Sequence, residues 1–267
     1  MSKRAKNTLK LTSDSFFFSI SNELLVYGKA ANTWDGQSKP TDEILKYFFE
    51  GETIGFCLYP DRVILREQSL QKQLVVAQHL LDTFRKPTIY VAFYDPALPS
   101  TAWEFMKIIN ERKLSVKSFV YRITEDSSEF IPRIMDECTE ITDCIWINAI
   151  FRDEKTNWIN LENFLNCRRI ILHLNKNSNL TPHSWNTFLR NWINSDAQLE
   201  CLCCYNIKPT DFLLMVDGLS DEGINRRRAY EWVDVKRRDG TEFVIGRIFD
   251  YMYLETREEH LEAWWRQ

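Results

Sequence analysis

Glycine and proline are scarce in this chain, with 8 of each among 267 residues. Because turns and irregular connections depend on these residues, their scarcity argues against a loop-rich β-sandwich and against low-complexity linkers. A basic excess is also lacking: the formal net charge is −4, whereas nucleic-acid binders usually carry many unpaired cations. We interpret the three local basic runs as solvated strand ends and turns, with a phosphate or acidic-peptide contact as the alternative: Arg168-Arg169, Arg226-Arg227-Arg228 and Lys236-Arg237-Arg238.

Long apolar runs are missing as well. No stretch approaches the roughly 18 apolar residues of a membrane span, and no apolar signal-peptide core follows the first four residues. We therefore expect an intracellular protein, cytoplasmic or nuclear, whose seven cysteines are reduced thiols. Hydrophobic residues make up 44% of the chain, enough to form a large core and to exclude disorder.

Motifs of catalysis and cofactor binding are absent. The eight glycines are dispersed, so the chain has no phosphate-binding loop of the Rossmann, Walker-A or kinase type. Its four histidines could form a catalytic triad only by chance proximity. The cluster Cys201-Leu202-Cys203-Cys204 lacks the second spaced pair of a structural zinc site, and we interpret these cysteines as small core residues. We expect no enzyme, no metal and no cofactor; a cluster of titratable groups in a deep pocket would support the alternative, an enzyme with an unfamiliar site.

Residues 1–69 have the pattern of a β-rich segment with one short helix. Thr41 is a plausible helix N-cap, and apolar residues on one face predict a helix over Thr41–Glu50. The expected strands are Thr8–Thr12, Ser15–Ile20, Leu24–Tyr27, Ile54–Leu58 and Val63–Arg66, with a turn at Pro60-Asp61.

Helical patterns and short apolar strands alternate over residues 70–220. The strand centres are roughly 25 to 31 residues apart, which is the length class of leucine-rich repeats, although the consensus letters are absent. The sequence predicts an α/β fold, a leucine-rich-repeat-like β/α solenoid with a largely parallel sheet; a doubly wound sheet is the rival. The expected helices are Leu70–Arg85, one capped by Thr101, one from Glu129, Leu161–Leu165, one from Thr181-Pro182 and one from Pro209; the expected strands are Ile89–Phe93, Val116–Tyr121, Cys144–Ile147, Arg169–Leu174 and Leu199–Cys204.

Residues 221–267 return to strands. Tyr230–Arg237 and Glu242–Tyr253 flank Arg238-Asp239-Gly240, which is a hairpin signal. Antiparallel strands are therefore expected on both the N-terminal and the C-terminal side of the repeat-like region. The tail carries Trp264 and Trp265, which we expect to dock the terminus onto the body, with a contact surface as the alternative.

Strand alternation predicts a partner-binding face. Residues expected to point inward are Ile89, Val91, Phe93, Ile145, Ile147, Ile170, Leu172 and Leu174. Large aromatic side chains dominate the binding energy of many interfaces, and solenoids bind partners on their concave sheet. The alternative is that the N-terminal strands or extra helices cover this face as a second core. The predicted partner-binding residues are Tyr90, Phe119, Tyr121, Trp146, His173 and Glu200.

A family resemblance covers about residues 140 to 245. Its opening is Trp158-Ile159-Asn160-Leu161 through Ile170-Ile171-Leu172-His173-Leu174, followed by Thr181, Trp185-Asn186, Phe188-Leu189-Arg190, Trp192-Ile193 and Leu199-Glu200, then Val216-Asp217-Gly218-Leu219 and Asp234 to Thr241. This order of motifs resembles the F-box-associated domain (type 2) of nematode F-box proteins. The motifs are structural and carry no catalytic residues.

The resemblance implies a non-enzymatic substrate adaptor. In that family an F-box docks a Skp-type adaptor and a cullin-based ubiquitin ligase, and the associated domain captures a specific protein for ubiquitin-dependent degradation. Residues 1–50 have the pattern of strands and lack the Leu-Pro start of an F-box. The adaptor and ligase are thus expected partners only if the full-length protein has an F-box. Nucleic acid and membranes are not expected partners. The alternative is a stand-alone binder that sequesters or neutralises one protein in the manner of an antidote.

Overall fold

The structure of the protein is a computed structural model. It describes residues 15–27, 44–49, 52–58, 62–65, 69–83, 87–137, 141–150, 162, 165–174 and 180–265. The chain forms two compact units, Met1–Glu140 and Ile141–Gln267. The boundary between them falls inside the predicted repeat-like region 70–220. Among the described residues, no helix combines the length and the apolar character needed to cross a bilayer.

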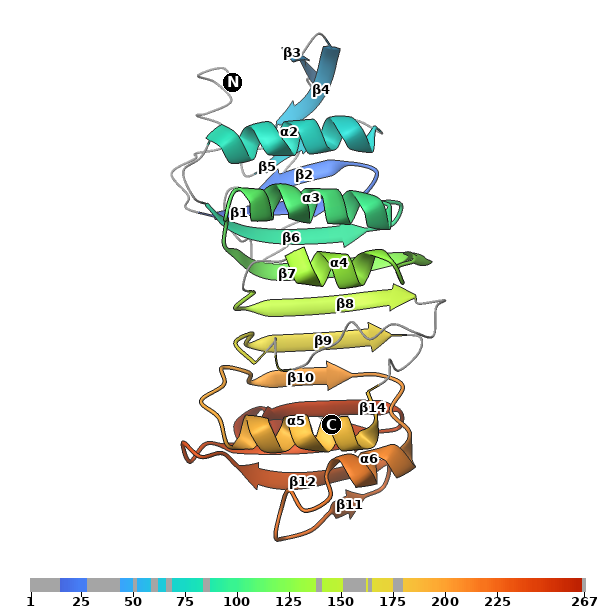
Figure 1. The fold of residues 1–267 in the computed structure, drawn as a ribbon, viewed down its shortest axis with the longest axis vertical. Coiled ribbons are helices and arrows are strands. Elements are labelled where there is room, and N and C mark those ends of the chain that lie inside the picture. The colour runs from blue at the N-terminus through green and yellow to red at the C-terminus, as the bar shows by residue number, and fades with distance from the viewer. Residues whose placement is uncertain are drawn as a thin grey trace. The chain divides into compact units, whose positions relative to one another are not determined.

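The sheet of unit 1 is partly parallel. Its strand order is β7-β6-β1-β2-β5-β4-β3, in which β7, β6 and β1 are parallel and the remaining neighbours are antiparallel (Figure 1). The strands are β1 (Ser15–Ile20), β2 (Leu24–Tyr27), β3 (Ile44–Phe49), β4 (Glu52–Leu58), β5 (Arg62–Leu65), β6 (Thr88–Tyr94) and β7 (Val116–Asp126); the helices are α2 (Leu70–Thr83), α3 (Pro99–Glu111) and α4 (Phe130–Glu137).

An aromatic core joins α3 to this sheet. The ring of Phe93 in β6 lies 5.9 Å from Phe105 of α3 and 6.1 Å from Phe119 of β7. All three side chains are fully buried. Aromatic rings at such distances and tilted angles pack favourably beyond the area that they bury.

Two predictions for unit 1 are wrong. Residues Ile44–Phe49 form strand β3, paired antiparallel with β4, and not a helix. The run Ile-Leu-Lys-Tyr-Phe-Phe is rich in residues that favour strands, and six residues are too few for apolar spacing to separate the two structures. Thr101 is not a cap either: α3 begins at Pro99 after Leu98, and Thr101 is buried inside the helix. The expected strand Thr8–Thr12, the cap at Thr41 and the turn at Pro60-Asp61 lie outside the described residues.

The sheet of unit 2 has the order β8-β9-β10-β14-β13-β12-β11. β8, β9 and β10 are parallel, and β14, β13, β12 and β11 continue the sheet as antiparallel strands. The strands are β8 (Cys144–Ile150), β9 (Arg169–Leu174), β10 (Cys201–Cys204), β11 (Asn225–Arg227), β12 (Tyr230–Lys236), β13 (Glu242–Ile248) and β14 (Tyr251–Thr256); the helices are α5 (Pro182–Ile193), α6 (Pro209–Met215) and α7 (Arg257–Trp265). Each unit thus has a mixed α/β fold with a partly parallel sheet, as the sequence predicts in its coarse form.

Helix α5 begins as predicted. The hydroxyl of Thr181 accepts a hydrogen bond from the backbone N–H of Ser184 at 3.1 Å, and Pro182 occupies the first turn. Proline is tolerated there because its missing N–H has no partner within the helix. The buried stripe of α5 is Trp185, Phe188, Leu189 and Trp192.

Several motif residues of the family resemblance hold α5 and α6 together. The side-chain amide of Asn186 donates to the carbonyl oxygens of Met215 (2.9 Å) and Asp217 (3.0 Å), and Arg190 donates to the same Asp217 carbonyl at 2.7 Å. Gly218 has a φ of +62°, and a Cβ there would meet the Arg190 guanidinium. These positions are scaffold, because they tie the carbonyl groups at the end of α6 to α5.

The C-terminal region differs from the prediction of a single strand over Glu242–Tyr253. The segment is two strands, β13 and β14, that reverse direction at Phe249 and Asp250. Phe249 is 72% exposed and has a φ of +55°. The turn is therefore evident from the backbone conformation and not from the residue type. Strand β14 lies between β10 and β13, while β11 and helix α7 were not predicted. The side chains of Trp264 and Trp265 lie outside the described part of α7.

Candidate functional site

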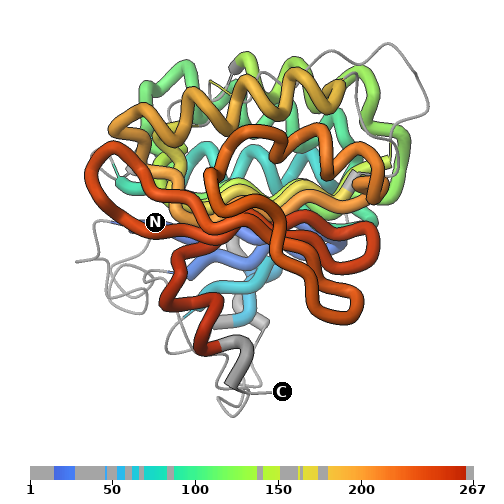
Figure 2. Tube along the Cα trace, turned by 90° about the horizontal axis from the view of Figure 1, so that it is seen from below, coloured from blue at the N-terminus to red at the C-terminus, as the bar shows by residue number. Residues whose placement is uncertain are grey.

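The two faces of the unit 2 sheet are covered by different helices. Trp192 of α5 contacts Phe243 of β13 at 4.9 Å between ring centroids, so the helices pack on the face that carries Phe243. We call the opposite side the open face. Figure 2 shows α5 on one side of this sheet and α7 on the other. Expected inward residues with described side chains are buried under the helices: Ile145, Ile147, Ile170 and Leu172.

Two of the predicted binding residues lie on the open face. Trp146 of β8 is half-buried and His173 of β9 is exposed. In strand register, Trp146 lies beside Ile171, and Ile171 beside Cys203 of β10. These three side chains therefore form one row across the parallel strands of unit 2.

Phe119 and Tyr121 were predicted on the binding face, and this is wrong. Both are fully buried in unit 1, and the Tyr121 hydroxyl is hydrogen-bonded to Ser127 Oγ at 2.7 Å. The cause is a register shift between β6 and β7: Ile89 pairs with Val116, whereas Tyr90 pairs with Ser118. A bulge of one residue reverses the alternation beyond it, so Phe119 and Tyr121 face the core.

The remaining two predicted residues do not join the row on the open face. Tyr90 is half-buried in unit 1, beside Phe17 of β1 in register. Glu200 precedes β10 and forms an exposed ion pair with Arg168 at 2.6 Å. Exposed pairs of this kind contribute little to stability, roughly 0–1 kcal/mol.

A continuous series of ring contacts crosses the open face. His173 stacks on Tyr205 at 4.3 Å, Tyr205 lies 4.8 Å from Tyr251, and Tyr251 lies 5.9 Å from Tyr253. The ring of His260 in α7 then lies 5.9 Å from Tyr253 and 6.0 Å from Trp232. We call this series the aromatic row; its members are His173, Tyr205, Tyr251, Tyr253, His260 and Trp232.

Gly246 gives Tyr253 its place in the aromatic row. The two residues are direct partners in β13 and β14, and a Cβ on Gly246 would overlap the phenol ring. Burial raises the pKa of Tyr253 above its ordinary value, so the phenol is neutral. A strand glycine covered by a cross-strand aromatic ring is a recognised way to fix sheet register.

We predict that Gly246→Ala destabilises the protein. The added methyl group must displace the Tyr253 ring, and overpacking of this kind costs about 1–3 kcal/mol. Chemical denaturation followed by tryptophan fluorescence measures the change, and Gly240→Ala, where a Cβ would have open space but φ is +89°, separates the ring clash from backbone strain. The double change Gly246→Ala with Tyr253→Ala should be less destabilising than the sum of its parts; strict additivity would contradict the contact.

Helix α7 is fixed at its first turn. The Thr256 hydroxyl accepts from the Glu259 N–H at 3.2 Å, and the Glu259 carboxylate accepts from the Thr256 N–H at 3.4 Å. This is a capping box, and its Thr-x-x-Glu signature was present in the sequence. His260 follows and is only 6% exposed; its Nδ1 lies 2.9 Å from a carboxylate oxygen of Glu255.

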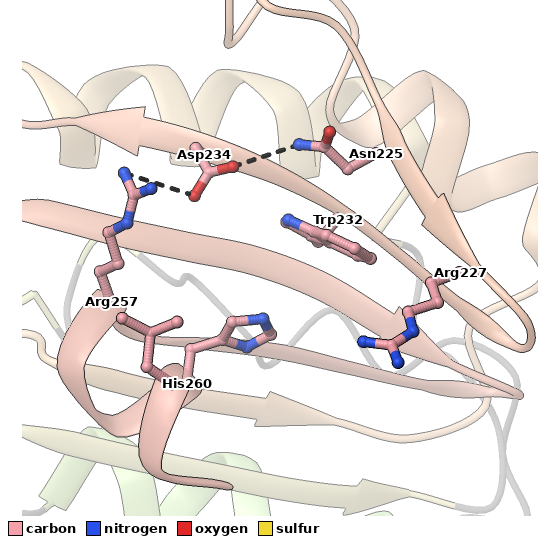
Figure 3. Close-up of a pocket in the computed structure, with 7 residues that line it drawn as sticks. Asn225, Arg227, Trp232, Asp234, Arg257 and His260 are labelled. Carbon is pink, nitrogen blue, oxygen red and sulfur yellow. Dashed lines mark hydrogen bonds and ion pairs between the residues drawn. The ribbon is translucent and has the colours of Figure 1, made fainter. Parts of the chain in front are cut away.

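A pocket of about 550 Å³ lies where α7 meets the edge of the sheet. Figure 3 shows Arg257 and Arg227 at its two ends, with Trp232 and His260 between them. Its volume is within the range of ligand pockets, about 300–1,000 Å³. The lining residues are Asn225, Arg227, Trp232, Asp234, Arg257, His260 and Leu261.

Charged side chains of both signs line the pocket. Asp234 is its one carboxylate: it accepts from the Asn225 side-chain amide at 3.1 Å and lies 3.9 Å from Arg257. Arg257 also pairs with Glu242 at 3.2 Å, outside the lining. With Arg227 as a second guanidinium, two permanent cations lie near two carboxylates, Asp234 in the lining and Glu242 outside it.

The cysteine interpretation holds for some residues and not for others. Cys57, Cys167 and Cys204 are buried, whereas Cys201 and Cys203 are half-buried on the open face. The alternation of the sequence placed this pair opposite Cys204, which is what the structure has. Within the described part of the chain, no three His, Cys, Asp or Glu residues gather in a way that could hold a metal ion.

Comparison with known proteins identifies no relative, because no family model, no curated protein and no solved structure matches the chain. The resemblance to the F-box-associated domain stays a prediction from the residues that carry it.

Proposed function

We propose that unit 2 binds another protein through its open face, as the substrate-recognition part of a ubiquitin ligase receptor would. The observation that supports this proposal is the accessible part of the aromatic row, which consists of His173, Tyr205, Tyr251 and Trp232. Tyr253 and His260 are buried and connect Tyr251 to Trp232 beside the pocket. Tyrosine and tryptophan provide large, stiff contact surfaces at a small entropic cost, and they are enriched among the residues that dominate binding energy. No catalytic arrangement is needed for this role.

The pocket gives the proposed interface a specificity element. Trp232 and His260 supply flat walls, and the guanidinium groups of Arg227 and Arg257 are donors that an acidic side chain of the partner can accept from. Charge complementarity of this kind mainly controls association rate and choice of partner. An acidic segment that crosses the aromatic row and places one carboxylate in the pocket would use both features.

We propose further that the β/α units belong to a leucine-rich-repeat-like solenoid. In unit 1, β6 and β7 are parallel neighbours in chain order, and β8, β9 and β10 follow the same rule in unit 2. Strand neighbours in chain order are what stacked repeats produce.

Loss of partner capture on Trp146→Ala with Tyr205→Ala tests the proposed interface. Both residues are half-buried on the open face, and removal of two hot-spot aromatics should weaken binding by about 2 kcal/mol or more, roughly 30-fold. Affinity purification from cells with quantitative mass spectrometry measures the loss, and thermal melting checks that the variant is folded. Leu214→Ala is the matched control, because Leu214 is 61% exposed on α6, on the other side of the sheet.

The proposal fails if the double variant and Leu214→Ala retain the same proteins. A ligase receptor and a stand-alone binder differ in what accompanies the captured protein. A Skp-type adaptor and a cullin that co-purify with the full-length natural protein would support the receptor, whereas capture of one target without either would support sequestration.

A further inference from the structure

Three side chains on the open face form a compact thiol–phenol cluster. Cys201 and Cys203 occupy alternate positions of β10, with their Sγ atoms 4.0 Å apart, and Cys203 Sγ lies 2.9 Å from the hydroxyl oxygen of Tyr251. All three residues are half-buried, so each keeps part of its surface exposed on the open face. The cluster is distinct from the pocket, whose lining does not include it.

The arrangement stabilises a thiolate on Cys203 in particular. Cys201 S–H and Tyr251 O–H can both donate to its sulfur, and hydrogen bonds to the charged form of a group favour that form. The hydrogen bond from Cys201 is the main reason that the pKa of Cys203 is lowered, and Tyr251 adds to it against the effect of burial. The Tyr251 pKa is raised, chiefly by burial, so its phenol keeps the proton that it donates.

The charged neighbours come from two other strands. Arg169 of β9 pairs with Cys201 in register and favours the thiolate, while Glu255 of β14 opposes it. Cys201 behaves in the opposite way to Cys203: its pKa is raised, first because it donates the hydrogen bond. The two thiols therefore divide into one donor and one nucleophile.

Two buried cysteines, Cys167 and Cys204, do not compete with Cys203 for a disulfide reagent. Burial raises the pKa of Cys167 to about 12 and that of Cys204 to about 12. At neutral pH each is almost wholly a thiol, and the thiolate is the nucleophilic form. Reactivity should thus be higher in the cluster than at these two cysteines. Cys144 of β8 is the other described half-buried cysteine, and peptide mapping distinguishes it from Cys203.

We propose that Cys203 is the site at which this protein undergoes thiol–disulfide exchange with small disulfides such as oxidised glutathione. The Cys203 thiolate attacks one sulfur of the disulfide, and a bond forms between Cys203 Sγ and that sulfur. The original sulfur–sulfur bond breaks, and the released thiolate takes a proton from solvent. Cys203 is oxidised, the leaving thiol is reduced, and no further oxidant is required.

The adduct would change the open face. Cys203 lies beside Ile171 in register and against Tyr251 of the aromatic row. A glutathionyl group there would cover the row and add negative charge, so modification should oppose partner capture. This regulatory consequence rests on the proposed function, whereas the modification site itself does not.

Thiol kinetics on the reduced, folded protein test the site. With 5,5′-dithiobis(2-nitrobenzoate) at pH 7, we expect one thiol to react at least about 10-fold faster than the others, and peptide mapping after exposure to oxidised glutathione should place the adduct on Cys203. Cys203→Ser should remove the fast phase, and Cys204→Ser, a buried neighbour on the other face, should keep it. Tyr251→Phe should slow the fast phase and move its pH profile to higher pH, because the phenol donor is lost.

Three results would overturn the assignment. They are a fast phase that survives Cys203→Ser, an adduct mapped to another cysteine, and uniform reactivity in protein shown to be folded by its cooperative melt. Capture assays with glutathionylated and reduced protein test the regulatory consequence and the proposed function separately. An adduct on Cys203 with unchanged capture removes the regulatory consequence alone, and an adduct without any capture removes the proposed function while the thiol site stands.

Discussion

Replacement of Trp192 by alanine should lower the free energy of unfolding by about 3–5 kcal/mol, the usual cost of removing a large buried aromatic side chain. The side chain is 0% exposed, and its indole N–H donates to the carbonyl oxygen of Leu199 at 3.0 Å. Its ring meets Phe243 edge-on, which is a direct contact between α5 and the sheet of unit 2. The variant would leave a cavity and a buried carbonyl oxygen without its donor.

Arg237 adds to this cost. Its guanidinium lies 5.1 Å from the Trp192 ring centroid and donates to the carbonyl oxygens of Ser195 and Ala197. Its side chain is 5% exposed, and Asp239 lies 3.8 Å away. Loss of the ring would therefore remove a cation–π partner from a cation that is largely out of water.

Urea denaturation measures the Trp192 effect, with Trp192→Phe as the control. Phenylalanine keeps a ring and loses the N–H donor, so its cost should be smaller than that of alanine. Equal losses in the two variants would mean that the ring contributes little beyond the hydrogen bond. A loss under about 1 kcal/mol for Trp192→Ala would contradict the packing of α5 described above.

Phe119→Ala should destabilise the protein by about 3–5 kcal/mol and leave partner capture intact under conditions where the variant is folded. Phe119 is 0% exposed and lies between Phe93 and Tyr121, at 6.1 and 6.2 Å between ring centroids. It therefore supports the core of unit 1. The measurement combines denaturation with the same affinity purification that tests the open face.

Val120→Ala is the matched control for Phe119→Ala. Val120 is the next residue of β7, half-buried on the opposite side, so its truncation should cost under about 1 kcal/mol. If Phe119→Ala kept full stability and lost capture instead, the original assignment of Phe119 to a binding face would be right. The pair of variants thus distinguishes core from interface at adjacent positions.

The sequence predicts the elements of unit 2 better than it predicts their surfaces. Thr181-Pro182 located the start of α5 because the cap and the first-turn proline act within four residues. Trp146 and His173 were placed on a face correctly, since β8 and β9 alternate without interruption. Local chemistry of this kind can be read directly from the chain.

Features that depend on distant partners could not be predicted in this way. The shift between β6 and β7 is a property of the pair, and it alone moved Phe119 and Tyr121 into the core. Helix α7 has little apolar periodicity, so its position depends on contacts of His260 with strands before it in the chain. The pocket required β11, β12 and α7 to meet, which no single segment indicates.

The position of β14 has a consequence for biosynthesis. This strand is made after every other strand of unit 2, yet it lies between β10 and β13. On the ribosome, the parallel group β8–β10 and the hairpin β12–β13 cannot pair with each other before β14 emerges between them. Until then, each has an edge strand whose backbone N–H and C=O groups lack their partners. Chaperone association during translation should therefore persist until residues 251–256 have left the exit tunnel, and it should end abruptly once they pair.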